Sequence, residues 1–148
     1  MATQDQERNA VILRRTFAAT PERVFAAWTK PEEVKRWFGP EGFESSRAEV
    51  DLRVGGAFRF HLVGPDGAVH VAAGEYREIE PPKRLVFTWG WETGANPFES
   101  RVTIELTPAG KGGTEFVMTH DLFPDEATRN SHESGWTGSL DKLQKILG

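Results

Sequence analysis

Two histidines in the C-terminal third of the chain are the side chains best suited to proton chemistry. His120 occupies the apolar phase of a predicted strand, and His132 comes four residues before Trp136 on one face of a predicted helix. A neutral imidazole can donate one hydrogen bond and accept another, so the pair could orient a polar group of a ligand in an apolar interior. A second interpretation stays open, in which such a histidine is buried and satisfies a backbone group.

The familiar catalytic motifs do not occur in the sequence. It contains no cysteine, no GxSxG nucleophile motif and no glycine-rich phosphate-binding loop. Histidines at HxxxH or HxH spacing do not occur either, and His61 falls on the solvent-facing phase of its strand, so we expect no metal site. We predict no cofactor and a non-catalytic role. The alternative is a cyclase-like or hydrolase-like enzyme with His120 or His132 as base and Tyr76 as acid.

Aromatic side chains are the most numerous candidates for a binding site. The sequence contains five Trp and ten Phe, and several share one phase of the predicted strands and helix. Core packing is one explanation, and a cavity of about 300 to 1,000 Å³ between sheet and helix is the other. Flat rings and a methionine suit an apolar or aromatic guest. The candidate ligand-binding residues are Phe58, Phe60, Tyr76, Phe87, Trp89, Met118, His120, His132 and Trp136.

The first elements that position these side chains are a strand and two short helices. Apolar residues recur over 11–17, which predicts a strand. Thr20-Pro21 and Lys30-Pro31 begin two helices, because a capping hydroxyl and a proline at the first helical position are typical helix starts. Gly39-Pro40 ends the second helix.

Six meandering strands are predicted to follow. Val50, Leu52 and Val54 alternate with polar residues, and Gly55-Gly56 turns the chain into the next strand. The alternation breaks near Gly74, which suggests a bulge. Short turns join all these strands, so the sheet should be antiparallel. After the first of the six, the strands are expected near 58–62, 69–79, 85–91, 101–106 and 116–122.

One long helix is predicted over about 125–147, with Asp125 as its N-cap. It would be roughly 33 Å long at about 1.5 Å per residue, and no other predicted element is long enough to cover the sheet. Its apolar face is formed by Trp136, Leu140, Leu143 and Leu147.

Two glycines interrupt this helix, where each is expected to cost about 1 kcal/mol relative to alanine. Gly135 and Gly138 could permit a close approach of helix and sheet. They could instead allow the helix to bend and open the mouth of a pocket.

The order of these elements and several local phrases resemble the START-like superfamily (SRPBCC, helix-grip fold). Within it, the sequence is similar to the family of activator of heat-shock-protein-ninety ATPase homologues, in its single-domain bacterial form. The resemblance runs from about residue 10 to the end. The matching phrases are Thr20-Pro21-Glu22-Arg23-Val24-Phe25, Ala27-Trp28-Thr29, Trp37-Phe38-Gly39-Pro40, Val54-Gly55-Gly56, Pro81-Pro82-Lys83-Arg84-Leu85-Val86-Phe87-Thr88-Trp89, His132 with Gly135-Trp136, and Leu140-Asp141-Lys142-Leu143.

The resemblance implies an α+β helix-grip fold, a curved antiparallel sheet wrapped around the long C-terminal helix. It also implies a lipid, sterol, polyketide or other apolar ligand held between them. The namesake co-chaperone speeds the ATPase of its chaperone with help from a second, N-terminal domain that this sequence lacks. We therefore expect binding of a small apolar or amphipathic molecule, with a chaperone-interaction role as the alternative.

Composition limits the remaining possibilities. Residues 1–8 are polar and predict a disordered tail, and 9–148 should form a single domain. A net charge of -4 with scattered basic residues argues against nucleic-acid binding. No stretch approaches the roughly 20 apolar residues of a membrane span. We expect a cytoplasmic monomer or weak homodimer.

Overall fold

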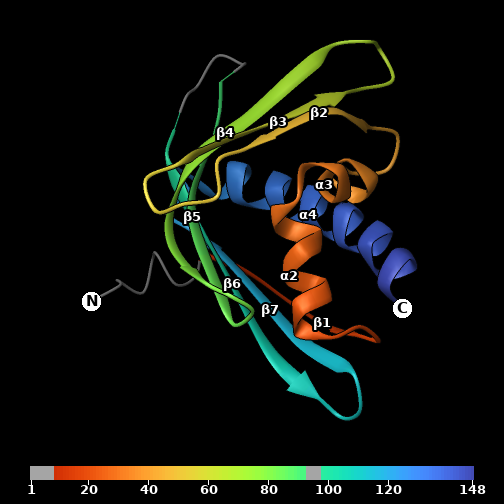
Figure 1. Cartoon of the computed structure of the whole chain (residues 1–148). Helices are drawn as coiled ribbons and strands as arrows, with labels where there is room; N and C mark the ends of the chain where they lie inside the picture. The colour runs from red at the N-terminus through yellow and green to blue at the C-terminus, as the bar shows by residue number, and fades with distance from the viewer. Residues whose placement is uncertain (1–8, 93–97) are drawn as a thin grey trace.

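A computed structural model describes residues 9–92 and 98–148, and the predicted disordered tail lies outside these residues. One curved sheet and three helices make up this part of the chain (Figure 1). The strands are β1 (Val11–Phe17), β2 (Glu44–Val50), β3 (Ala57–Val63), β4 (Val69–Glu80), β5 (Arg84–Trp91), β6 (Ser100–Ala109) and β7 (Gly113–Asp121). The helices are α2 (Pro21–Thr29), α3 (Pro31–Trp37) and α4 (Glu126–Leu147).

The seven strands form one antiparallel sheet in the order β1-β7-β6-β5-β4-β3-β2. Strands β2 to β7 are a meander, and β1 closes the far edge with Val11 opposite His120 and Phe17 opposite Thr114. The sheet curves around α4, and α2 and α3 lie on the same concave side (Figure 1). The predicted α+β helix-grip architecture is therefore confirmed.

Side-chain caps begin two of the helices as predicted. The Thr20 hydroxyl accepts the backbone N–H of Arg23 at 3.2 Å before α2. The Asp125 carboxylate accepts the backbone N–H of Thr128 at 2.7 Å before α4, and this bond lowers the pKa of Asp125. Among the helices that the structure describes, none is both long and apolar enough to span a bilayer.

The prediction of a strand through Val50, Leu52 and Val54 is wrong. Strand β2 ends at Val50, and residues 51–56 form the loop to β3. Leu52 and Val54 are 42% and 66% exposed in this loop. The real strand reads ESSRAEV, which has too few apolar residues for periodicity to locate it.

Strand β4 is irregular just beyond the glycine that suggested a bulge. Its register with β5 shifts between Tyr76 and Glu78. A Cβ atom on Gly74 would lie 1.8 Å from the carbonyl oxygen of Thr88, so no larger residue fits there. The glycine therefore permits a close approach of β5, and the bulge follows it.

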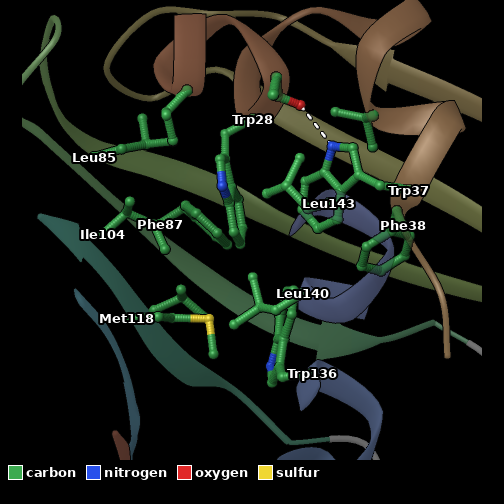
Figure 2. Close-up of a cluster of buried hydrophobic side chains, with 14 of the residues drawn as sticks. Trp28, Trp37, Phe38, Leu85, Phe87, Ile104, Met118, Trp136, Leu140 and Leu143 are labelled. Carbon is green, nitrogen blue, oxygen red and sulfur yellow. Dashed lines mark hydrogen bonds between the residues drawn. The ribbon is translucent and has the colours of Figure 1, made fainter. Parts of the chain in front are cut away.

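The core fills the space between α2, α4 and the sheet (Figure 2). Trp28 of α2 stacks on Phe116 and on Trp136, with ring centroids 5.7 Å apart in both pairs. The indole N–H of Trp37 donates to the carbonyl oxygen of Ala27 at 2.9 Å. The predicted apolar face of α4 is confirmed, because all four of its members are buried: Trp136, Leu140, Leu143 and Leu147.

Candidate functional site

A cavity of about 280 Å³ lies between α4 and strands β3 to β5. The segment from α3 to β2 closes a third side. Five of the lining side chains are Phe or Trp, and no Asp, Glu, Lys or Arg occurs among the described residues that line it. The lining residues are Phe38, Gly39, Pro40, Phe43, Leu62, His70, Trp89, Trp91, Ser131, His132, Gly135, Trp136 and Ser139.

Three of the nine candidate residues line this cavity, namely Trp89, His132 and Trp136. The other six lie in the core around it, because the rings of α2 and α3 occupy the deeper space beneath the sheet. Burial raises the pKa of the Tyr76 phenol, which packs against Phe58 and Phe87. The six buried candidates are Phe58, Phe60, Tyr76, Phe87, Met118 and His120.

Sequence reasoning missed two contributions to the wall. The segment after α3 provides Phe38 and Phe43, and strand β4 provides His70. His70 pairs with Leu62 of β3, so both side chains lie on the inner face of the sheet. The pairing register with the Phe58-Phe60-Leu62 alternation could have indicated this orientation.

His132 connects α4 to β5. Its Nε2 atom accepts the indole N–H of Trp91 at 2.9 Å, and its Nδ1 atom lies 2.8 Å from the carbonyl oxygen of Thr128. These partners require a neutral ring with the proton on Nδ1, which donates to that carbonyl. Burial lowers the pKa of His132, which favours the same neutral form.

His120 connects the core side of α4 to β6. Its Nδ1 atom accepts the indole N–H of Trp136 at 3.0 Å, and its Nε2 atom lies 2.7 Å from the Ser100 hydroxyl. That hydroxyl donates to the carbonyl oxygen of Trp89 at 2.8 Å, so the proton between His120 and Ser100 belongs to Nε2. Burial, with a smaller contribution from His132, lowers the pKa of His120 to about 2.

The two histidines hold the cavity wall together. Their ring centroids are 5.4 Å apart, and every ring nitrogen already has a hydrogen-bond partner within the protein. Neither ring has a nitrogen free for a guest in this arrangement. Within residues 9–92 and 98–148, no three metal-ligating side chains are grouped closely enough to hold an ion.

The two glycines of α4 have opposite surroundings. A Cβ atom on Gly138 would lie 3.2 Å from the Cα atom of Pro40, so this glycine allows the segment after α3 to pack closely on the helix. A Cβ atom on Gly135 would meet no described atom within 4 Å, and this glycine lines the cavity. Gly138 therefore permits a close approach, but to the segment after α3 and not to the sheet, and α4 stays helical through both glycines.

Two hydrogen bonds fix the segment between α3 and β2 against α4. The Ser139 hydroxyl accepts the backbone N–H of Gly39 at 3.0 Å and donates to the carbonyl oxygen of Gly135 at 3.1 Å. The Lys142 ammonium donates to the carbonyl oxygen of Phe43 at 2.9 Å, and burial lowers the pKa of Lys142. The cavity thus has two walls joined by specific polar contacts.

Residues 18–148 match the model of the family described as "Activator of Hsp90 ATPase homolog 1-like protein". The chain belongs to this family. No curated protein matches it.

Solved structures of similar proteins support the assignment. Protein CV1439 from Chromobacterium violaceum is 30% identical, with 95% of this chain and 97% of that chain covered and a TM-score of 0.86. The AHSA1 protein of Silicibacter pomeroyi is 30% identical, with coverages of 93% and 96% and a TM-score of 0.82. PFC0360w, an HSP90 activator from Plasmodium falciparum, is 26% identical, with coverages of 93% and 94% and a TM-score of 0.74.

Proposed function

We propose that this protein binds a small apolar or amphipathic molecule, without converting it chemically, in the cavity between α4 and the sheet. The observation that carries the proposal is the open space at Gly135, which lines the cavity together with the rings of Trp89 and Trp136. Glycine inside a helix costs about 1 kcal/mol relative to alanine. A glycine that lowers helix stability and leaves open space beside it is accounted for if the space holds a ligand. The proposed compartment is the cytoplasm. The chain contains no cysteine and so does not depend on the oxidising conditions in which disulfides form.

The size and lining of the cavity favour a small guest with one or two rings. Its volume of about 280 Å³ lies just under the usual 300 to 1,000 Å³ of ligand pockets. Rings of Phe38, Trp89 and Trp136 offer flat apolar surfaces that suit a planar molecule. A lipid with two acyl chains would exceed this volume.

Titration with naphthalene, followed by amide chemical shifts in two-dimensional NMR, tests the proposal. We expect saturable shifts at residues 131–139 of α4 and at Phe38 and Phe43. The Gly135→Leu variant fills the cavity from a position without steric conflict, and its affinity should fall at least about tenfold. Ser134→Leu, at an exposed position of the same helix, is the matched control and should bind normally. Unchanged binding by Gly135→Leu would contradict the proposal, as would the absence of saturable shifts in the wild-type protein with both naphthalene and its hydroxylated analogue.

A second candidate function is interaction with an HSP90-type chaperone. The family description and the likeness to the Plasmodium activator favour it. The test is the ATPase rate of a purified bacterial HSP90 with this protein at saturating concentration. A rate increase of severalfold would support the interaction, and an unchanged rate would remove it.

A further inference from the structure

The cavity wall contains two polar side chains that no internal partner uses. Neither the imidazole of His70 nor the hydroxyl of Ser131 makes a hydrogen bond within the described part of the chain. Two other polar side chains of the wall already make hydrogen bonds: His132 accepts the indole N–H of Trp91, and Ser139 accepts the backbone N–H of Gly39. The indole N–H of Trp89 also lacks a partner, but it is fully enclosed and closed to a guest.

The strand pairing within the sheet places His70 in the cavity wall. Its pairing with Leu62 directs it to the inner face, where its ring lies 6.0 Å from the ring of Phe43 between centroids. His61 of the neighbouring strand alternates to the outer face and lies 3.9 Å from the carboxylate of Glu49. His70 therefore faces the cavity and His61 faces away from it, which makes His61 a suitable control for substitutions of His70.

The charge of the wall limits the class of guest. No charged side chain lines the cavity among the residues that the structure describes. An ionised guest would lose its water there without gaining a fixed counter-charge, and such burial is costly. A neutral guest with one hydroxyl group avoids this cost. Its hydroxyl can donate to an imidazole nitrogen and accept from a serine hydroxyl, which are the two side-chain groups left free.

We propose that the cavity is selective for a small neutral phenol and that His70 recognises the phenol hydroxyl, with Ser131 as a second contact. This proposal rests on the function proposed above and specifies the chemistry of its ligand. The aromatic wall accounts for the planar ring. A phenol with an ordinary pKa near 10 is neutral at pH 7 and keeps its donor proton.

Three probes of similar shape separate the hydroxyl donor from the ring. Beta-naphthol has the donor, its methyl ether keeps only the acceptor oxygen, and naphthalene has neither. We expect the wild-type protein to bind beta-naphthol about tenfold more tightly than the ether or naphthalene, measured by calorimetry and amide chemical shifts. Three similar affinities would overturn the assignment of a phenol and leave the cavity proposal standing.

Variants assign the preference to a residue. In His70→Phe, which keeps an aromatic ring but removes both nitrogens, the preference for beta-naphthol over naphthalene should fall to about twofold or less. The matched control His61→Phe makes the same change on the outer face and should keep the tenfold preference. A preserved preference in His70→Phe would overturn the role of His70. Ser131→Ala should lower the preference by a few-fold.

The two proposals fail in different ways. If none of the three probes gives saturable binding to the wild-type protein, the cavity is not a binding site and both proposals fall. If all three bind and Gly135→Leu abolishes binding, but the hydroxyl makes no difference, only the phenol proposal falls. The comparison of probes uses the unaltered protein, so it holds even where a variant does not fold.

Discussion

Helix α4 meets the rest of the molecule in two different ways along its length. In the closed region, Leu140 and Leu143 are fully buried and pack in the same core as Trp28. In the open region, Gly135 borders a cavity of about 280 Å³. Gly138 lies between the two and contacts Pro40 closely. The helix is therefore continuous past the cavity, and at Gly135 it has no side chain to fill the space.

This difference shows that two glycines within one helical turn can have different structural roles. Gly138 removes a side chain so that two backbones can approach, whereas Gly135 leaves the space empty. The histidines differ in a similar way. His120 and His132 each accept a hydrogen bond from a tryptophan indole, whereas the imidazole of His70 makes no hydrogen bond to any residue that the structure describes.

The largest effect is expected from removing the centre of the closed region. Trp28→Ala should lower the free energy of unfolding by about 3–5 kcal/mol, because it leaves a large cavity among Trp37, Phe116 and Trp136. Phe43→Ala in the open region should cost less than half as much, since Phe43 is only partly buried. Urea denaturation followed by circular dichroism measures both. Equal losses would erase the distinction between the regions.

The second largest loss of stability is expected at His120, which accepts the indole N–H of Trp136. His120→Leu leaves the indole N–H of Trp136 without an acceptor, and an unsatisfied buried group costs about 1–3 kcal/mol. The Ser100 hydroxyl loses one of its two hydrogen bonds and keeps the one to the carbonyl oxygen of Trp89. We expect a loss of about 2–4 kcal/mol in the free energy of unfolding. His70→Leu removes no internal hydrogen bond and should cost under about 1 kcal/mol. The idea fails if thermal and urea unfolding rank the two variants in the opposite order.

A dependence of stability on pH should follow from His120. Its pKa is about 2 in the folded protein, against an ordinary value of 6.5 that we take for the unfolded chain. Between these values only the unfolded chain binds the proton, so the contribution is fully present above about pH 6.5 and is lost as the pH falls. The slope from this residue approaches about 1.4 kcal/mol per pH unit, or about 2 kcal/mol at pH 5.

The control for this slope is His120→Gln, which retains polar groups but does not titrate. Its stability should change less between pH 7 and pH 5 than that of the wild-type protein, in urea titrations at each pH. An identical slope in both proteins would assign the pH dependence to other groups.

The smallest effect sharpens the comparison of the two glycines. Gly135→Ala should raise the free energy of unfolding by up to about 1 kcal/mol, because alanine favours the helix and its methyl group would meet no other described part of the chain within 4 Å. Gly138→Ala gains the same helix preference but presses its methyl group against Pro40 and the backbone of Glu41. It should therefore be the less stable of the two by thermal unfolding. Equal gains would show that the Pro40 segment yields without cost.

The fold was largely predictable because its signals are local and periodic. The face of α4 from Trp136 to Leu147 repeats at helical spacing, and the caps at Thr20 and Asp125 depend on neighbouring residues. Strand β2 was misplaced since its apolar residues are few and the loop after it alternates by chance. Local pattern decides an element only where the pattern itself is strong.

The candidate site was predicted only in part, because its shape depends on contacts between distant residues. Trp89, His132 and Trp136 share an inward phase, which the sequence can show. Whether an inward-facing ring packs in the core or lines the cavity depends on the side chains that the helices place opposite it. Trp28 of α2 fills the space beside Phe87, and Phe38, just after α3, fills the space beside Phe60. None of the described side chains fills the space at Gly135. His70 required the register of β3 with β4, which no local pattern fixes.

The arrangement of tryptophans gives the protein its own optical reporter. Three of its five tryptophans, Trp89, Trp91 and Trp136, line the cavity, whereas Trp28 and Trp37 lie in the closed core. A guest that enters would change the surroundings of the first group and leave those of the second nearly constant. Intrinsic tryptophan emission should therefore report occupancy of the cavity without a label.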